Sequence, residues 1–160
     1  MTTSAEPRRT AAGFTLSEAM VVVALVAILA ALAAPSFHTQ IANQRVSAAG
    51  QDLLGLLQFA RAEAVYKRRP THTESSGPKW EVTADNKVLR EALLPDNVSV
   101  EAASKDGVSF DVTGAARVAS GTTPYKVSLS STHASRIECL SVMGAGLVKL
   151  QRVAAGADCP

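Results

Sequence analysis

One carboxylate occupies a position that requires a chemical explanation. Glu18 is the only ionisable side chain between Phe14 and Ala34, and residues 19–34 are all alanine, valine, leucine, isoleucine or methionine. An apolar run of about 20 residues can cross the hydrocarbon core of a bilayer as a helix. A carboxylate costs about 2.5–3.5 kcal/mol near the middle of such a helix and less toward its end. We therefore expect Glu18 to act electrostatically, by pairing with a positive group, rather than catalytically.

The two cysteines, Cys139 and Cys159, are the second pair of residues with possible chemistry. In an exported chain such a pair indicates one disulfide. The bond would close a loop of about 20 residues and contribute roughly 3 kcal/mol of stability. Two unrelated buried thiols are the alternative. A metal site is less expected, because the pair lacks the CxxC spacing of common zinc sites.

Catalytic chemistry has little support in the remaining residues. The histidines are far apart in sequence and lie among serine, threonine and glutamine, which favours exposed positions for His38, His72 and His133. No nucleophile–base arrangement, phosphate loop or cluster of metal ligands is recognisable. A net charge of +2 and an aromatic content of 4% argue against nucleic-acid binding by bulk charge or base stacking. We expect no enzymatic activity, no metal and no cofactor.

Hydrophobic periodicity predicts a long helix that carries Glu18 near its start. Pro35 follows the apolar run, where a proline bends a helix without necessarily ending it. Beyond it, apolar residues recur at steps of three and four up to Val65, and Pro70 ends the pattern after three basic residues. A continuous helix from Phe14 to Arg69 would be about 80 Å long. One small domain cannot cover such a rod, so lipid or other subunits must cover its first half.

After Pro70 the pattern changes to the alternation typical of strands. Short alternating segments separated by turn residues predict strands at 80–83, 98–101, 108–111, 125–129, 136–142 and 147–150. The fold class is therefore α+β, with the long N-terminal helix packed on a C-terminal antiparallel β-sheet or small β-sandwich.

The N-terminal residues resemble the class III signal of type IV pilins and type II secretion pseudopilins. The resemblance rests on a charged leader, the Gly13-Phe14 junction, Glu18 and the apolar run, all in one short segment. It implies that a prepilin peptidase cleaves after Gly13 and N-methylates Phe14. It also implies that Glu18 sets the assembly register by meeting the methylated amine of a neighbouring subunit. Pro35 matches the helix-bending proline of pilins.

An ordinary secretory signal peptide, cleaved near residues 31–33, is the alternative interpretation. Three features argue against it. A polar hexapeptide separates Arg8 and Arg9 from the apolar core, Glu18 opens that core, and the core is longer than the usual 7–15 residues. A twin-arginine export signal is less favoured, because Arg8-Arg9 lacks the bulky apolar pair that would follow it.

A second segment narrows the family. Residues 57–64, Leu-Gln-Phe-Ala-Arg-Ala-Glu-Ala, resemble the helix-end signature Leu-x-x-Ala-Arg-(Ser/Ala)-Glu-Ala of the GspH/FimT branch. That branch contains the minor pseudopilin of type II secretion and the FimT and FimU minor pilins. Simple surface polarity on an amphipathic helix would also explain Arg61 and Glu63.

Some FimT proteins bind DNA for natural transformation, and the family then places Arg-x-Arg after a glycine near the C-terminus. This chain has Gly146 followed by leucine at the first arginine position and Lys149 at the second. Lys149, Arg152 and Arg136 are the candidate contacts to phosphates. Three scattered cations are also typical of an ordinary solvated surface.

These observations predict four segments. They are a leader peptide (1–13), a transmembrane and assembly half of the helix (14–35), an amphipathic half (36–69) and a periplasmic β-domain (70–160). Because Arg8 and Arg9 place the leader in the cytoplasm, the chain should cross the bacterial inner membrane once. After assembly it should lie in a pilus or pseudopilus.

The predicted function is that of a minor type IV pilin acting in pilus assembly, as an initiation or tip subunit. A GspH-like minor pseudopilin of a type II secretion system is the alternative, and a DNA-binding minor pilin for natural transformation is the second alternative. The expected partners are the prepilin peptidase, other major and minor pilins or pseudopilins, and the inner membrane, with DNA a less favoured one.

Overall fold

The structure is a computed structural model that describes residues 13–104, 107–118 and 123–160, and within residues 33–35 the backbone alone. The predicted leader lies outside the described residues except for Gly13. The chain divides into two compact units, one ending at Phe37 and the other running from His38 to Pro160. Within the described residues there are one helix and nine strands.

The helix α1 spans Leu16–Lys67 and ends two residues before the predicted end at Arg69. Arg68 adopts a left-handed backbone conformation with φ of 51°, which ends a helix in the manner usual for its C-terminus. The Arg69 amide then donates to the Ala64 carbonyl at 3.2 Å. Pro70 follows and cannot continue the helical hydrogen bonding.

The first part of α1 is exposed on every side. All its large apolar side chains through Leu32 are between 49% exposed, at Val22, and 81% exposed, at Leu16. No described part of the chain covers them. In the described residues no single helical stretch is both long and apolar enough to cross a membrane. The consecutive stretches Leu16–Leu32 and Ser36–Lys67, taken together, meet that requirement in length and composition.

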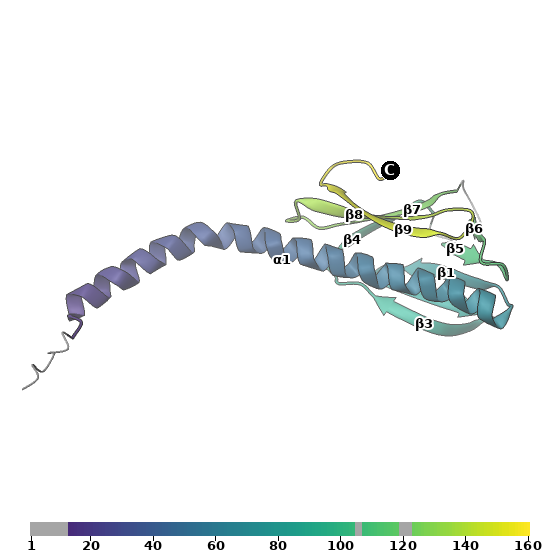
Figure 1. The fold of residues 1–160 in the computed structure, drawn as a ribbon, viewed down its shortest axis with the longest axis horizontal. Helices are drawn as coiled ribbons and strands as arrows, with labels where there is room; N and C mark the ends of the chain where they lie inside the picture. Colours follow the sequence, from purple (N-terminus) through teal and green to yellow (C-terminus); the bar gives the residue numbers. More distant parts are fainter. Residues whose placement is uncertain (1–12, 105–106, 119–122) are drawn as a thin grey trace, which may run out of the picture. The chain divides into compact units, whose positions relative to one another are not determined.

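The described strands form two antiparallel sheets (Figure 1). The first has the strand order β3-β2-β1-β5-β6 and the second β4-β7-β8-β9. Their bounds are β1 Thr71–Ser76, β2 Lys79–Ala84, β3 Lys87–Leu93, β4 Ser99–Ala102, β5 Val108–Phe110, β6 Ala116–Val118, β7 Tyr125–Ser130, β8 Arg136–Val142 and β9 Val148–Ala154.

Both sheets and residues 42–64 of α1 enclose one hydrophobic core. The helix contributes side chains at the predicted three- and four-residue steps, including the fully buried Leu53 and Leu57. The first sheet contributes Trp80 and Phe110, and the second Tyr125, all at most 1% exposed. The predicted α+β fold is therefore confirmed, and of the two predicted arrangements of strands the one with two sheets is observed.

A glycine and an ion pair with a buried carboxylate lie where α1 approaches the second sheet. A Cβ atom on Gly50 would lie 3.2 Å from the Cβ of Glu138 and 3.3 Å from Cδ1 of Leu150. The Glu138 side chain is 4% exposed and accepts a 2.8 Å hydrogen bond from Nε of Arg152. Arg152 in turn donates to the Ser47 hydroxyl at 3.0 Å. This chain of polar contacts compensates the cost of burying the Glu138 carboxylate beside the helix.

The sequence prediction missed the strands β1, β3 and β6. β1, with the sequence THTESS, has too few apolar residues to show the alternation of a strand. It nevertheless lies between β2 and β5, because its inward polar side chains find partners. Thr71 donates to the Ala60 carbonyl at 3.0 Å, and Thr73 to the Val108 carbonyl at 2.6 Å. β3 is an edge strand with a register shift opposite Val82/Thr83, which disrupts its alternation.

Candidate assembly site

The first turn of α1 is closed by a reciprocal pair of hydrogen bonds. The Thr15 hydroxyl accepts from the Glu18 amide at 3.2 Å, and a Glu18 carboxylate oxygen accepts from the Thr15 amide at 3.4 Å. This is a capping box, which satisfies amides that the first helical turn leaves unpaired. The Thr-x-x-Glu spacing carried this signal, although the sequence prediction assigned Glu18 only a role between subunits. The carboxylate also lies where the positive end of the helix dipole favours it.

The predicted cleavage junction lies just before this turn and is accessible. Phe14 is 80% exposed, and neither Gly13 nor Phe14 belongs to the helix. A Cβ atom on Gly13 would meet no described atom within 4 Å. Nothing in the described chain therefore requires glycine at this position, so any intolerance of a larger residue would come from the enzyme that binds the junction.

The predicted bend at Pro35 falls where the backbone alone is described. The helix α1 includes Pro35 in its bounds. The proline side chain lies outside the described residues, and the bend stays a prediction.

Arg61, in the helix-end signature, connects α1 to both sheets. Its Nε donates to the Gly114 carbonyl at 3.1 Å, in the β5–β6 turn, and its Nη2 donates to the Ala145 carbonyl at 3.3 Å, in the β8–β9 turn. The first residue of β6 also meets the β8–β9 turn directly, since the Ala116 amide donates to the Gly144 carbonyl at 2.9 Å. Surface polarity is therefore not the reason for arginine at this position. Sequence spacing gave no sign of these partners, because carbonyl acceptors belong to every residue type.

The glycines of these turns allow the close approach. A Cβ atom on Gly146, which has φ of +76°, would lie 1.7 Å from the Gly114 carbonyl oxygen. Asp111 shapes the β5–β6 turn by accepting from the Thr113 hydroxyl and amide at 2.6 and 2.9 Å. Both hydrogen bonds hold the pKa of Asp111 below its usual value, and the bond from the Thr113 hydroxyl has the larger effect.

Glu63, the acid of the helix-end signature, forms an ion pair just beyond the end of its own helix. It accepts a 3.1 Å hydrogen bond from Arg69, which also donates to Asp85 at 2.9 Å. Hydrogen bonding to Asp85 first, and then to Glu63, raises the pKa of Arg69. The ion pair between Arg69 and Asp85 ties the segment that follows the helix to the turn between β2 and β3.

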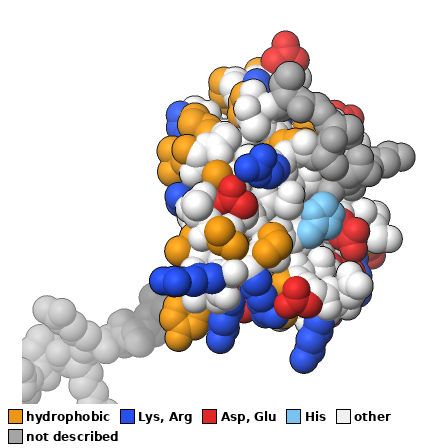
Figure 2. Space-filling model, turned by 90° about the vertical axis from the view of Figure 1, so that its right-hand side faces the viewer, with side chains coloured by type: hydrophobic (Ala, Val, Ile, Leu, Met, Phe, Trp, Pro, Cys, Tyr) orange, Lys and Arg blue, Asp and Glu red, His pale blue; other side chains and the backbone are white. Residues whose placement is uncertain are grey.

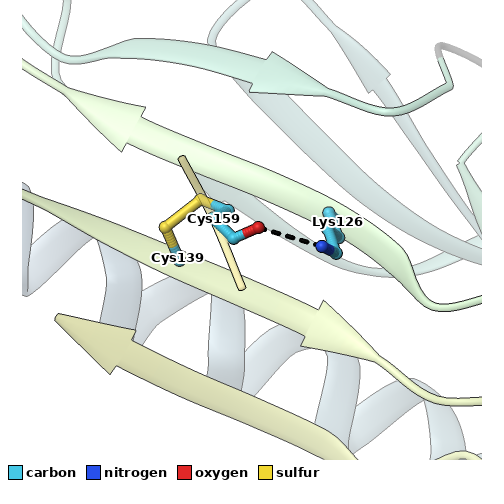
Figure 3. The surroundings of a disulfide bond; sticks show 3 residues. All are labelled: Lys126, Cys139 and Cys159. Atoms are coloured by element: carbon cyan, nitrogen blue, oxygen red, sulfur yellow. Dashed lines mark hydrogen bonds between the residues drawn. A yellow bond between two sulfur atoms is a disulfide. The ribbon is translucent and has the colours of Figure 1, made fainter. Parts of the chain in front are cut away.

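The two cysteines form the predicted disulfide, Cys139–Cys159, with a sequence separation of 20 (Figure 3). Cys139 is in β8, and Cys159 belongs to the C-terminal segment that follows β9. Lys126 of β7 donates to the Cys159 carbonyl at 2.9 Å. The disulfide and this hydrogen bond fasten the C-terminal segment to the second sheet.

The structure does not bring the three candidate DNA contacts together. Arg152 points toward α1, where it pairs with Glu138 and Ser47. Lys149 is three residues away on the same strand, so it faces the opposite side of the sheet. Arg136 pairs in register with Ala154, on the same face as Arg152 and diagonally across from it, so that Lys149 alone is separated from the other two. Among the described residues, no group of three or more His, Cys, Asp or Glu side chains could hold a metal ion.

Comparison with known proteins agrees with this geometry. The family model described as Type II transport protein GspH matches residues 49–146, and the one described as Prokaryotic N-terminal methylation motif matches residues 8–34. Among solved structures, the chain is similar to the type IV minor pilin FimU of Pseudomonas aeruginosa PAO1, with 20% identity and a TM-score of 0.58. That match covers 68% of this chain and 89% of FimU.

The fold is also similar to that of EpsH, the minor pseudopilin from the type 2 secretion system of Vibrio cholerae. The identity is 12% and the TM-score 0.54, over 71% of this chain and 99% of EpsH. A comparison with curated proteins gave no match. The GspH match, the methylation motif and the fold agree with the resemblance found in the sequence. This chain belongs to the GspH family of minor pilins and pseudopilins.

Proposed function

We propose that this chain is a minor type IV pilin that acts in pilus assembly, as an initiation or tip subunit. The observation that carries the proposal is the N-terminal part of α1. It exposes apolar side chains in all directions, and its one carboxylate, Glu18, is also exposed. Such a surface is stable only inside lipid or against other apolar helices.

The mechanism follows from the cost of an isolated charge in apolar surroundings. After cleavage behind Gly13, the new amine of Phe14 on one subunit and Glu18 of the next would form an ion pair. An unpaired carboxylate in such surroundings is costly, and pairing removes much of that cost. Only one stagger between neighbouring helices brings the two groups together, so the pair sets the register while the apolar surfaces supply the contact area.

The proposed location is the bacterial inner membrane, with residues 38–160 in the periplasm. Two features support it. The Cys139–Cys159 disulfide suits an oxidising compartment, and Arg8 and Arg9 precede the apolar run as a cytoplasmic segment would. Before assembly the prepilin peptidase would cleave after Gly13 and methylate Phe14.

A minor pseudopilin of a type II secretion system is the second candidate, because the matching family model is that of a type II transport protein. Deleting the chain should abolish surface pili if the first proposal holds. Loss of secreted proteins with normal pili would favour the second.

The register mechanism is tested with Glu18→Ala, with Thr15→Ala as the matched control. Both variants break the capping box, but only the first removes the carboxylate. We expect both proteins to reach the inner membrane and to be cleaved to Phe14, as mass spectrometry of the membrane fraction would measure. Glu18→Ala should be absent from sheared pili while Thr15→Ala is present. Glu18→Asp, which is shorter by one methylene, should lie between.

Equal amounts of Glu18→Ala and wild-type protein in sheared pili would contradict the register mechanism. Loss of both variants would assign Glu18 a role in helix capping alone. A mature N-terminus near Ser36, in place of a methylated Phe14, would contradict the pilin processing itself.

A further inference from the structure

A second surface lies at the opposite end of the domain from the point where α1 enters it. It consists of the last turns of α1 and the β5–β6 and β8–β9 turns, which Arg61 holds together. Figure 2 looks onto this end of the molecule, where hydrophobic side chains lie among lysine and arginine side chains and some acidic ones.

This end concentrates exposed apolar side chains. Val65 is 46% exposed, Tyr66 79%, Val112 46%, Met143 42% and Leu147 53%. We call these five residues the turn-end patch. In the described part of residues 38–160, the other exposed large hydrophobic residues are Ile41, Val88 and Leu93. Contiguous apolar patches on a folded domain mark interaction sites more often than scattered apolar residues do.

The patch is hollowed rather than flat. A depression of about 690 Å³ lies between the helix and the β8–β9 turn, lined by residues that include Val65, Tyr66 and Leu147. Its floor is fixed, because Arg61 bonds to carbonyls of both turns and Gly146 lies against Gly114. A preformed apolar hollow of this kind can accept a large side chain at a small ordering cost.

Two basic residues, Lys67 and Arg68, directly follow Tyr66, which lines the hollow. Nζ of Lys67 lies 5.0 Å from the centre of the Tyr66 ring. Lys67 and the adjacent Arg68 are exposed, and neither makes an ion pair with a described carboxylate. The nearby carboxylates of Glu63 and Asp111 are already occupied by Arg69, Thr113 and Arg117. A complementary surface must therefore bring its own negative charge.

We propose that the turn-end patch binds an acidic segment of another polypeptide. A large apolar side chain of that segment sits in the hollow against Val65, Tyr66 and Leu147, and flanking carboxylates meet Lys67 and Arg68. This site goes beyond the proposed assembly function, which uses the N-terminal part of α1.

Other occupants fit the patch less well. Two basic side chains, Lys67 and Arg68, are too few to bind a nucleic-acid backbone, because affinity there grows with the number of phosphates contacted. Membrane surfaces that attract proteins by charge use clusters of 4–8 basic residues. Two copies of the patch placed face to face would bring like charges together, which disfavours a symmetric pair of this chain.

The test is photocross-linking in the bacterium that makes the protein, using the full chain. A benzophenone amino acid replaces Tyr66 in one variant and Leu93 in the control, which is 74% exposed on the edge strand β3. We expect position 66, and not position 93, to give one adduct with another polypeptide. Sequencing of the cross-linked peptide should find a large apolar residue with Asp or Glu within a few positions.

Two further substitutions in the position-66 variant measure the two parts of the site. Lys67→Glu should lower the adduct yield at least about threefold through charge repulsion. Leu147→Ser should lower it by at least a similar factor, because the hollow loses an apolar wall. The control Leu93→Ser should leave it unchanged. Formation of the Cys139–Cys159 disulfide reports folding in each variant. If Leu147→Ser does not accumulate, Lys67→Glu decides the question.

Several outcomes would overturn the proposal. They are no adduct at position 66, equal adducts from positions 66 and 93, an adduct with a second copy, with lipid or with nucleic acid, or a yield insensitive to Lys67→Glu. Recovery of the protein in sheared pili is scored separately. Assembly into pili without the position-66 adduct would refute this site and leave the assembly function standing. An adduct at position 66 without recovery of the protein in sheared pili would support this site and refute the assembly function.

Discussion

Replacing Arg61 with methionine tests whether its side chain holds the two sheets together. Methionine keeps an unbranched apolar stem of similar volume and removes the guanidinium. The change deletes the hydrogen bonds to the Gly114 carbonyl at 3.1 Å and the Ala145 carbonyl at 3.3 Å. Both acceptors lie in turns, and the start of β6 contacts the β8–β9 turn through the hydrogen bond from Ala116 to Gly144.

The expected loss of stability follows from the two bonds. A hydrogen bond to a charged group contributes about 1.5–3 kcal/mol. The bond to Gly114 is part-buried, so the lower end of that range applies to it. The bond to Ala145 is longer and exposed, and should contribute about 0.5 kcal/mol. The free energy of unfolding should fall by about 2 kcal/mol in total. For a unit of about 120 residues, this lowers the Tm by roughly 6–10 °C.

Thermal and urea unfolding of a fragment that starts at His38 would measure this loss. The matched control is Arg45→Met, because Arg45 is an exposed arginine on the same helix that makes no ion pair among the described residues. Hydrogen exchange at the Ala116 amide should also become faster in Arg61→Met, since its bond to Gly144 loses support. Arg61→Lys, which has a single cationic group, should retain part of the stability.

A Tm within about 2 °C of wild type for Arg61→Met, equal to that of Arg45→Met, would refute the role assigned to Arg61. Unchanged exchange at the Ala116 amide would also contradict it. The two turns would then be held by their own backbone contacts alone.

Three further predictions concern the same domain. Replacing both Cys139 and Cys159 by serine should lower the free energy of unfolding by about 3 kcal/mol, measured by urea unfolding, and reduction of the wild type should reproduce the effect. Burial raises the pKa of Tyr125 to about 12. Its folded-state pKa exceeds the unfolded value, so the stability it contributes is present below about pH 10 and is lost as pH rises toward 12. Tyr125→Phe should lose less stability than wild type between pH 10 and 12. An equal loss in the two proteins would contradict this account of Tyr125. A fragment of residues 38–160 should bind duplex DNA with a Kd weaker than about 100 µM at physiological salt. Submicromolar binding that falls when Lys149 and Arg152 become glutamine would instead support the role in transformation.

The sequence alone predicted the long apolar helix in the N-terminal part of this protein, because the relevant signals are local. The Gly13-Phe14 junction, Glu18 and the apolar run are contiguous, and an apolar helix longer than any covering domain implies an external partner whatever the rest of the chain does. The buried face of the second half of α1 was also predictable, since a helix repeats its contacts at fixed steps. The disulfide was predicted from two cysteines in a chain that we expect to be exported.

Only the tertiary structure decided how the rest of the chain is arranged. β1 has the composition of a loop and lies inside a sheet, because Thr71 and Thr73 find carbonyl acceptors there. Periodicity cannot predict that, since the partners come from residues 60 and 108. The two hydrogen bonds from Arg61 could not be predicted for the same reason, since their acceptors are the carbonyls of residues 114 and 145.

The surfaces also depend on the fold. Lys149 and Arg152 are three residues apart in sequence and face opposite sides of one strand, while Tyr66 and Leu147 are far apart in sequence and line one hollow. Local signals record what a segment can form by itself. Which side chains share a surface depends on strand pairing and on turns that meet only after the chain has folded.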